Sequence, residues 1–408
     1  MESKVRPPER LAFADVTLQA EASAKMMERI RGAILAPSAA KKSPIFKADD
    51  VCALSGVAKS TMTYRLGSRK DLPTGTLNET GRRRNFTLGE TRQWVQDFRK
   101  EMLRPEGAEA ITISIANFKG GTTKTTTAMT LAQGLTLLGH KVLMVDADPQ
   151  ASATTFFGIL PDVEIDDTNT IFALVDGSQT SIRPMIRPTY WEGLDLVPAS
   201  ASLFGAEFLL PAMQNSKQGF EFWSVLDLGI NDVRTDYDVI IIDTPPALSY
   251  ITINALMASN GIIMPLPPQT LDYASANQFW GLFAELSATL MGAGAAAKKF
   301  DFINILLSRV ERSPSSDTVR AWINNTYGDK VLPLEIPKTS TAGTKSAEFG
   351  TVYDFEDADL KDRTYKRARE AYDLFVNYVD AAIRTAWSRQ LIDLGDESFA
   401  PSNLAVAP

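Results

Sequence analysis

The sequence is poor in cysteine and histidine, with one of each in 408 residues. Because Cys52 is alone, no disulfide framework can form within the chain, which fits a reducing, cytoplasmic setting. No apolar run reaches the ~18 residues that a membrane-spanning helix needs, and the opening residues, MESKVRPPERLAF, lack the apolar segment of a signal peptide. We therefore expect a cytoplasmic protein that does not act at a membrane. We place Cys52 in a small hydrophobic core and His140 in a surface turn between a helix and a strand.

Charge is distributed unevenly along the chain. Residues 41–105 carry 14 Lys/Arg against 7 Asp/Glu, whereas residues 106–408 carry 22 against 37. A basic segment ahead of an acidic remainder is typical of a nucleic-acid-binding module joined to another domain, although a merely solvated basic surface is the alternative. We divide the chain into an N-terminal helix with a possible role in dimerisation (1–40), a DNA-binding domain (41–105), a larger domain (106–394) and a flexible tail (395–408).

Helical periodicity marks the first two of these parts. Apolar residues recur at helical spacing over 15–36, and such a stripe needs a partner on its own chain or on a second subunit. A helix over Ala48–Leu54, a Gly-containing turn and a polar helix over Ala58–Leu66 form a helix-turn-helix pattern, and the basic stretch Gly81–Asn85 predicts a hairpin beside it, as in a winged arrangement. The candidate DNA-contacting residues in this domain are Lys59, Ser60, Thr61, Arg65, Arg82, Arg83 and Arg84.

The most informative stretch begins at Ile111. An apolar run, Ile111–Ala116, enters a Gly/Thr-rich turn that precedes a helical segment. This combination binds anions, because backbone N–H groups and the positive end of the helix dipole converge on phosphate. Lys124 can reach the β- and γ-phosphates, and the Thr125 hydroxyl suits Mg²⁺. The residues predicted to hold ATP or ADP here are Lys119, Gly120, Gly121, Thr122, Thr123, Lys124, Thr125 and Thr126.

Residues 103–110, which precede this stretch, are predicted to form a linker. Beyond the linker, apolar runs alternate with helical stretches. This alternation predicts a doubly wound, mostly parallel α/β sheet. A final helix over Thr364–Leu391 carries an apolar stripe that we assign to the core. The later runs are Lys141–Asp146, Leu194–Pro198, Asp238–Asp243, Gly261–Leu266, Phe302–Ser308 and Val331–Ile336.

Two of these runs end in aspartate. Asp146 is followed by Asp148 in VDADPQ, and Asp243 opens the sequence DTPP. Ligands of open α/β sheets bind at the carboxyl ends of the strands. An apolar strand that ends in Asp is the Walker B pattern, whose carboxylate can hold Mg²⁺ directly or through water. Together with the glycine turn, the two motifs predict a nucleotide site.

The glycine turn departs from the ordinary P-loop, which has glycine where this chain has Phe118 and Thr123. It fits KGGxxKT, with an additional lysine, Lys119, at its start. This resembles the deviant Walker A motif of the ParA/MinD family of P-loop ATPases. The resemblance covers residues from about 110 to about 390 and includes ANFKGGTTKTTTAMTLAQGL, VDADPQAS, DYDVIIIDTPPAL, LPPQTLDY and LLSRVE. With the N-terminal module, the chain is similar to the large, helix-turn-helix-bearing ParA proteins and the related RepA proteins of plasmid partition operons.

The resemblance implies roles for individual residues. Lys119 would cross a dimer interface to the partner's nucleotide. The catalytic set would be Lys119, Lys124 and Asp148, and Asp148 would orient the attacking water. Asp146 would support the Mg²⁺ site, with Thr125 and Asp243 as the other metal residues, and Pro267 of LPPQTLDY joins the nucleotide-binding set. Lys338 sits where the family carries a basic residue that holds non-specific DNA. Weaker candidates for that DNA surface are Arg309, Arg312, Lys361, Arg363, Lys366, Arg367 and Arg369.

The function implied by the resemblance is that of a slow ATPase that segregates a plasmid or secondary chromosome. It would dimerise with ATP, bind nucleoid DNA non-specifically and its own operator specifically, and be stimulated by a ParB-type partner. The alternative is a nucleotide-responsive transcriptional repressor with incidental ATPase activity. A MinD-like membrane ATPase would need a basic amphipathic tail in place of DLGDESFAPSNLAVAP. A reductase like the nitrogenase iron protein would need cluster-ligating cysteines, which residues 106–394 lack.

Overall fold

The computed structural model describes residues 12–34, 41–78, 81–292, 298–338, 350–354 and 363–395. They belong to two compact units, residues 1–42 and 43–408, which we describe separately. In the first unit, α1 (Phe13–Ile34) is a single helix on which Phe13, Val16 and Met26 are exposed. The helix predicted over 15–36 is thus present as far as Ile34. The rest of that prediction, and all but the first residue of the flexible tail predicted over 395–408, lie outside the described residues.

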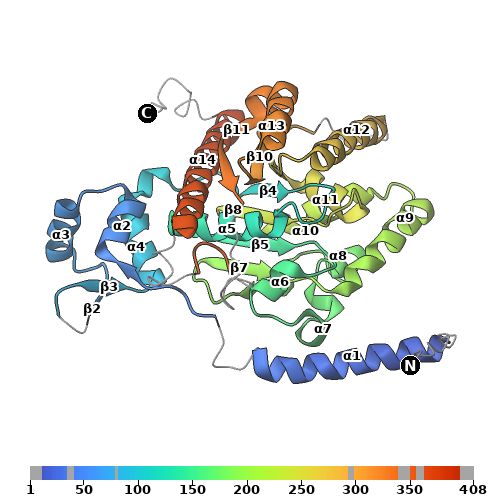
Figure 1. Ribbon diagram of the computed structural model, residues 1–408, viewed down its shortest axis with the longest axis horizontal. Helices are drawn as coiled ribbons and strands as arrows, with labels where there is room; N and C mark the ends of the chain where they lie inside the picture. Colours follow the sequence, from blue (N-terminus) through green and yellow to red (C-terminus); the bar gives the residue numbers. More distant parts are fainter. Residues whose placement is uncertain are drawn as a thin grey trace, which may run out of the picture. The chain divides into compact units, whose positions relative to one another are not determined.

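An eight-stranded sheet forms the centre of the second unit, with the order β11-β10-β9-β4-β8-β5-β7-β6 (Figure 1). Neighbouring strands are parallel except for the short edge pair β6–β7. The predicted mostly parallel α/β sheet is therefore confirmed, and each predicted run coincides with a strand. The strands are β4 (Ile111–Ile115), β5 (Val142–Asp146), β6 (Arg187–Pro188), β7 (Leu194–Val197), β8 (Val239–Asp243), β9 (Gly261–Leu266), β10 (Phe302–Val310) and β11 (Val331–Pro337).

Helices cover both faces of this sheet because alternate strand side chains point to opposite sides. Ile113 and Met144 pack into the cluster formed with α5 (Lys124–Leu137) and α14 (Arg363–Asp393). Leu143 and Ile242 pack on the other side, with α10 (Val225–Ile230) and α11 (Tyr250–Ala258). The remaining longer helices are α9 (Ala206–Ser216), α12 (Thr270–Gly292) and α13 (Pro314–Tyr327), and the short ones include α6 (Ser152–Phe156), α7 (Pro161–Glu164) and α8 (Phe172–Val175). Over the described ranges, no helix combines the length and the apolar character needed to cross a bilayer.

Residues 46–98 form a small module with its own core. It contains α2 (Ala48–Ser55), α3 (Lys59–Ser68), α4 (Leu88–Phe98) and an antiparallel sheet of β1 (Phe46–Lys47), β3 (Arg84–Phe86) and β2 (Thr76–Leu77). Gly56 ends α2 with a φ of 68°, a left-handed conformation that favours glycine. Cys52 is buried with Val51, Met62, Phe86 and Trp94, as predicted.

The module packs against α5 through the end of that helix which is farthest from the glycine turn. Arg92 of α4 donates from Nε to the Thr136 carbonyl (3.2 Å) and from Nη2 to the His140 carbonyl (2.9 Å). Gln96 donates to the Gly139 carbonyl at 2.8 Å. A cation here complements the negative end of the helix dipole. The segment 103–110, predicted to be a linker, is also tied to the domain, since Arg104 pairs with Asp238 at 2.9 Å.

His140 is fully buried, so its predicted position on the surface is wrong. Its Nε2 lies 2.6 Å from Oδ1 of Asp380 on α14, and the other carboxylate oxygen accepts from Arg99 at 2.9 Å. Burial would raise the pKa of Asp380, but the hydrogen bond from His140 and the charges of His140, Arg99 and Arg384 lower it below its ordinary value. The turn is thus covered by a polar network between α14 and the end of α4.

Asp380→Ala is expected to destabilise the fold by about 3–5 kcal/mol, because it leaves the buried Arg99 without a counter-charge. Since the pKa of Asp380 is lowered in the folded state, its contribution is present above the unfolded pKa and lost as pH falls through the folded one. Urea unfolding at neutral and acidic pH measures both effects. Glu370→Ala on the same helix is the control, since its exposed pair with Lys366 contributes about 0–1 kcal/mol. Equal losses in the two variants would contradict the assignment.

Candidate nucleotide site

The loop between β4 and α5 leaves open space above the start of a buried helix. Gly121 has a φ of 74°, and the nearest atom to a Cβ placed there is Nη1 of Arg309, at 3.8 Å. A Cβ at Gly120 would meet nothing within 4 Å. The first amides of α5 have no partner within the helix and face this space. The loop therefore offers amide donors of the kind that bind phosphate.

Backbone strain is concentrated around this loop. Among the described non-glycine residues, positive φ angles occur at Thr123 (73°), Ala151 (52°) and Arg309 (50°). Thr123 lies in the loop after β4, Ala151 follows β5, and Arg309 lies at the end of β10. All three are therefore toward the carboxyl edge of the sheet. A β-branched residue such as Thr123 is especially unfavourable in this conformation, at a cost of roughly 1–2 kcal/mol. Strain of this kind accumulates where function requires a fixed backbone.

The two lysines of the loop have different partners. Lys124 is 7 % exposed, and its Nζ donates to the Lys119 carbonyl at 3.0 Å. Burial lowers the pKa of Lys124, while the charges of Asp243 and Asp148 oppose that shift. Lys119 instead extends to α12, where its Nζ pairs at 2.9 Å with the buried carboxylate of Asp272. Lys124 therefore belongs to the carboxylate cluster of the site, and Lys119 is held beside it.

Three aspartates at the strand ends face the loop. Burial raises the pKa of Asp146 to about 7, despite hydrogen bonds from the Thr154 hydroxyl (2.7 Å) and amide (2.9 Å). Burial raises the pKa of Asp148 as well, although the Gln150 amide donates to it at 2.9 Å. Burial and the charge of Asp146 raise the pKa of Asp243 well above its ordinary value. A site with three such carboxylates and one buried ammonium calls for added positive charge.

Asp243 is the residue best suited to a cation. It is fully buried, and neither of its carboxylate oxygens has a hydrogen-bond partner. The Thr125 hydroxyl lies close enough to lower the pKa of Asp243, but outside ordinary hydrogen-bond geometry. A buried carboxylate without partners is costly unless a cation balances it. Asp243 and Thr125 thus fit Mg²⁺, which is usually held by one or two protein oxygens together with phosphates and water.

The remaining loop residues complete the cradle. The Thr122 hydroxyl donates to the Lys119 carbonyl at 3.2 Å, and Thr126 lies partly exposed in the first turn of α5. Pro267 is buried in the turn from β9 to α12, five residues before Asp272. The structure therefore places the predicted loop residues and the three aspartates at one edge of the sheet, and Pro267 follows β9 at the same edge. Sequence reasoning missed Asp272, which lies within LPPQTLDY, and Thr154, which follows VDADPQAS by two residues.

The DNA-contacting candidates lie in two separate places. On α3, Lys59 pairs with Asp49 at 2.7 Å, and Ser60 is exposed beside the half-buried Thr61. Arg65 faces inward, paired with Asp97 at 2.5 Å and stacked on Phe98. In the hairpin the side chains of Arg82 and Arg83 are exposed, whereas Arg84 donates to the Thr74 carbonyl at 2.7 Å. Lys338 and Arg312 instead line one pocket of the sheet domain.

The weaker DNA candidates that the structure describes all lie in the sheet domain, but their surroundings differ. Arg367 on α14 lines the pocket with Lys338, whereas Arg369 pairs with Asp373 and lies 4.1 Å from the ring centroid of Tyr353. Arg363 and Lys366 are exposed at the start of α14, and Lys361 lies outside the described residues. Arg309 donates to the Gly121 carbonyl at 2.8 Å, in the nucleotide loop.

A glycine loop ahead of a buried helix, a buried lysine and strand-end aspartates define a P-loop nucleotide-binding domain. A family model described as an AAA domain matches residues 110–292. A relative from Sinorhizobium fredii named replication protein A is 30% identical over 95% of this chain and 98% of its own length. The chromosome partitioning protein ParA of Caulobacter vibrioides is 28% identical over 55% of this chain and 80% of its own.

Solved structures share the fold of this chain. One described as a partition protein has a TM-score of 0.66 at 20% identity, over 91% of this chain and 98% of that one. Cobyrinic acid a,c-diamide synthase from Mycobacterium smegmatis, solved with an ATP analogue and magnesium, has a TM-score of 0.50 at 26% identity, over 66% of this chain and 93% of that one. The chain belongs to the ParA-type partition ATPases.

Proposed function

We propose that this protein segregates a plasmid or secondary chromosome by ATP-controlled binding to DNA. Mg²⁺-ATP joins two subunits, the dimer binds DNA of any sequence, and a ParB-type partner stimulates slow hydrolysis that dissolves the dimer. The observation that carries the proposal is the position of Lys119, which pairs with Asp272 outside the group formed by Lys124, Asp148 and Asp243. A lysine held beside the phosphate cradle is available to a second subunit.

In this scheme each residue of the site has one task. Lys124 and the amides of the glycine loop hold the β- and γ-phosphates, and Thr125 and Asp243 hold Mg²⁺, with Asp146 supporting the metal. Mg²⁺ supplies positive charge to the phosphates when it is bound. Asp148 orients the attacking water, and Lys119 of the opposite subunit adds the charge that phosphoryl transfer requires. Hydrolysis is thereby slow until two subunits meet.

Sedimentation with Mg²⁺-ATP, with Mg²⁺-ADP and without nucleotide tests this scheme. Of these three conditions, we expect a dimer only with Mg²⁺-ATP. An equal distribution of monomer and dimer in all three conditions would reject nucleotide-controlled dimerisation.

Binding to random DNA requires a local basic surface because the sheet domain is acidic overall, with 22 Lys/Arg against 37 Asp/Glu in residues 106–408. Lys338→Glu is expected to abolish ATP-dependent binding to random-sequence duplex, since a dimer loses two phosphate contacts and gains two repulsive charges. ATP-driven dimerisation is expected to stay near normal. Lys330→Glu, which changes an exposed lysine outside the DNA candidates, is the matched charge control. If Lys338→Glu binds random DNA at the wild-type concentration, the surface lies elsewhere.

The module of residues 46–98 supports operator binding as a winged helix-turn-helix domain. With Arg65 paired to Asp97, we assign base contacts to Lys59, Ser60 and Thr61 of α3. Replacing one of these three residues with alanine is expected to cost about 1–3 kcal/mol of binding free energy at the operator and to leave binding to other DNA unchanged. Arg83→Ala in the hairpin is expected to weaken binding to all DNA and to reduce the salt slope by about one. Filter binding across salt concentrations separates the two effects, and identical behaviour of both variants would contradict the assignment.

A nucleotide-responsive repressor is the second candidate function. The observation in its favour is the direct contact of α4 with the end of α5, through Arg92 and the Thr136 carbonyl. A nucleotide bound at the start of α5 thereby touches the same helix as the DNA-binding module. Stimulation of hydrolysis by the product of a neighbouring ParB-type gene distinguishes the two functions, because a repressor has no need of it.

A further inference from the structure

The last residues of β10 contact the nucleotide loop. Ser308 donates from its hydroxyl to the Thr122 carbonyl at 3.2 Å, and Arg309 donates from Nη1 to the Gly121 carbonyl at 2.8 Å. Each of these carbonyls shares a rigid planar peptide unit with the next amide, at residues 122 and 123. In a trans peptide the amide points away from the carbonyl. The contacts from β10 therefore hold the outer side of the peptide units whose inner side is offered to phosphate.

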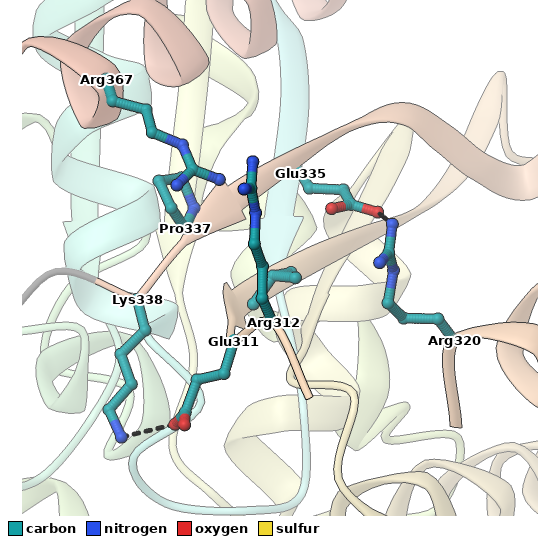
Figure 2. Close-up of a pocket in the computed structure, with 8 residues that line it drawn as sticks. Glu311, Arg312, Arg320, Glu335, Pro337, Lys338 and Arg367 are labelled. Atoms are coloured by element: carbon teal, nitrogen blue, oxygen red, sulfur yellow. Dashed lines mark hydrogen bonds and ion pairs between the residues drawn. The ribbon is translucent and has the colours of Figure 1, made fainter. Parts of the chain in front are cut away.

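The residues that follow line a basic pocket of about 610 Å³ (Figure 2). Glu311 pairs with Lys338, and Glu335 pairs with Arg320. Within the described residues, no hydrogen bond or ion pair engages Arg312 or Arg367. Figure 2 shows these two arginines reaching the pocket from the end of β10 and from α14. The pocket therefore has two free cations and two neutralised ones, a composition that suits adjacent phosphates.

The ion pair between Glu311 and Lys338 is weak enough to break at little cost in free energy. Both side chains are about half exposed, at 47% and 46%, and an exposed pair of this kind contributes only about 0–1 kcal/mol. The backbone on either side is fixed, because the Lys338 amide donates to the Val310 carbonyl at 3.0 Å. Glu311 also lines a second pocket, of about 230 Å³, together with Arg309. Arg309 and Glu311 therefore border the same hollow and are two residues apart in the chain.

We propose that Glu311 is a nucleotide-controlled gate on the basic pocket. Without nucleotide, Glu311 neutralises Lys338 and repels phosphate. When ATP draws the amides of residues 122 and 123 to its phosphates, the attached carbonyls shift, and Ser308 and Arg309 transmit that shift to Glu311. Lys338 is then released to join Arg312 and Arg367 on adjacent phosphates of duplex DNA. This inference rests on the proposed function, in which Lys338 contacts DNA.

The test compares Glu311→Gln with Glu335→Gln in the full-length chain. Both variants remove one negative charge from the same pocket, but only Glu311 follows the turn that contacts the nucleotide loop. Anisotropy of a labelled random-sequence duplex is measured without nucleotide and with Mg²⁺ and a slowly hydrolysed ATP analogue. We expect Glu311→Gln to gain about tenfold without nucleotide and much less with the analogue, whereas Glu335→Gln gains equally in both states. Equal gains for Glu311→Gln in both states would overturn the gate.

Two further measurements separate this inference from neighbouring explanations. Sedimentation of the nucleotide-free Glu311→Gln sample is expected to match the wild type, and dimerisation of that sample would assign the gain to avidity and reject the gate. The double variant Arg309→Ala/Glu311→Gln is expected to bind DNA without nucleotide as well as Glu311→Gln does, because Glu311 acts after Arg309. Loss of that gain in binding would reject this order of action.

If Lys338→Glu binds DNA normally, the proposed DNA surface fails. If Lys338→Glu abolishes binding and Glu311→Gln changes nothing, only the gate fails.

Discussion

Alanine in place of Lys124 is expected to abolish binding of both ATP and ADP. Lys124 is the buried cation of the site, opposite Asp148 and Asp243. Without it, the loop would present three buried carboxylates to a polyanion. Truncating one partner of a buried charge pair between protein and ligand costs about 2–5 kcal/mol of binding free energy, which corresponds to a loss of roughly 10–10³-fold or more in affinity.

Titration with a fluorescent ATP analogue in the presence of Mg²⁺ measures this loss, and circular dichroism checks that the variant is folded. Lys330→Ala is the matched control, because Lys330 is exposed and pairs with the exposed Asp329. It is expected to bind nucleotide as the wild type does. An affinity of Lys124→Ala within about twofold of the wild type would remove Lys124 from the site.

The sheet and its site could be predicted because their signals are local. Strands buried on both faces, such as β5 and β8, read as continuous apolar runs, and parallel strands bring their carboxyl ends to one edge. Asp146, Asp243 and the glycine loop therefore had to converge once the sheet was predicted. The edge strand β6 was not predicted, because it is two residues long and contains Pro188.

The buried polar network and the turn after β10 could not be predicted in this way. The buried His140 contacts Asp380, which lies 240 residues later in the chain, and Asp380 is held in turn by Arg99, 41 residues before His140. No spacing rule relates such residues. Arg309 was a weaker candidate for the DNA surface that the resemblance implies, but its backbone is left-handed and its guanidinium donates to the Gly121 carbonyl. Contacts of this kind depend on tertiary packing rather than on local pattern.

Lys119→Ala is expected to retain ADP binding but to lose ATP-dependent dimerisation and hydrolysis. The Lys119 side chain pairs with Asp272 of α12 rather than with the carboxylates around Lys124, so its loss leaves the phosphate cradle of its own subunit intact. In the proposed dimer the same lysine supplies charge to the nucleotide of the opposite subunit. Charges supplied in this manner to phosphoryl transfer contribute about 10³–10⁵ in rate. Hydrolysis is therefore expected to fall by at least about 10³-fold.

Asp272→Asn is the informative companion to this variant, because it removes the carboxylate that holds Lys119 and keeps the lysine. If Asp272 only holds Lys119 between encounters, Asp272→Asn dimerises with ATP at least as well as the wild type, since no ion pair must first be broken. Asp272 is nearly fully buried, and the asparagine occupies the same volume, so the start of α12 is expected to remain in place. Sedimentation with Mg²⁺-ATP and with Mg²⁺-ADP gives the comparison for both variants. A normal ATP-bound dimer of Lys119→Ala would show that the lysine is not needed across the interface. Failure of Asp272→Asn to dimerise would instead mean that the 2.9 Å ion pair belongs to the active arrangement.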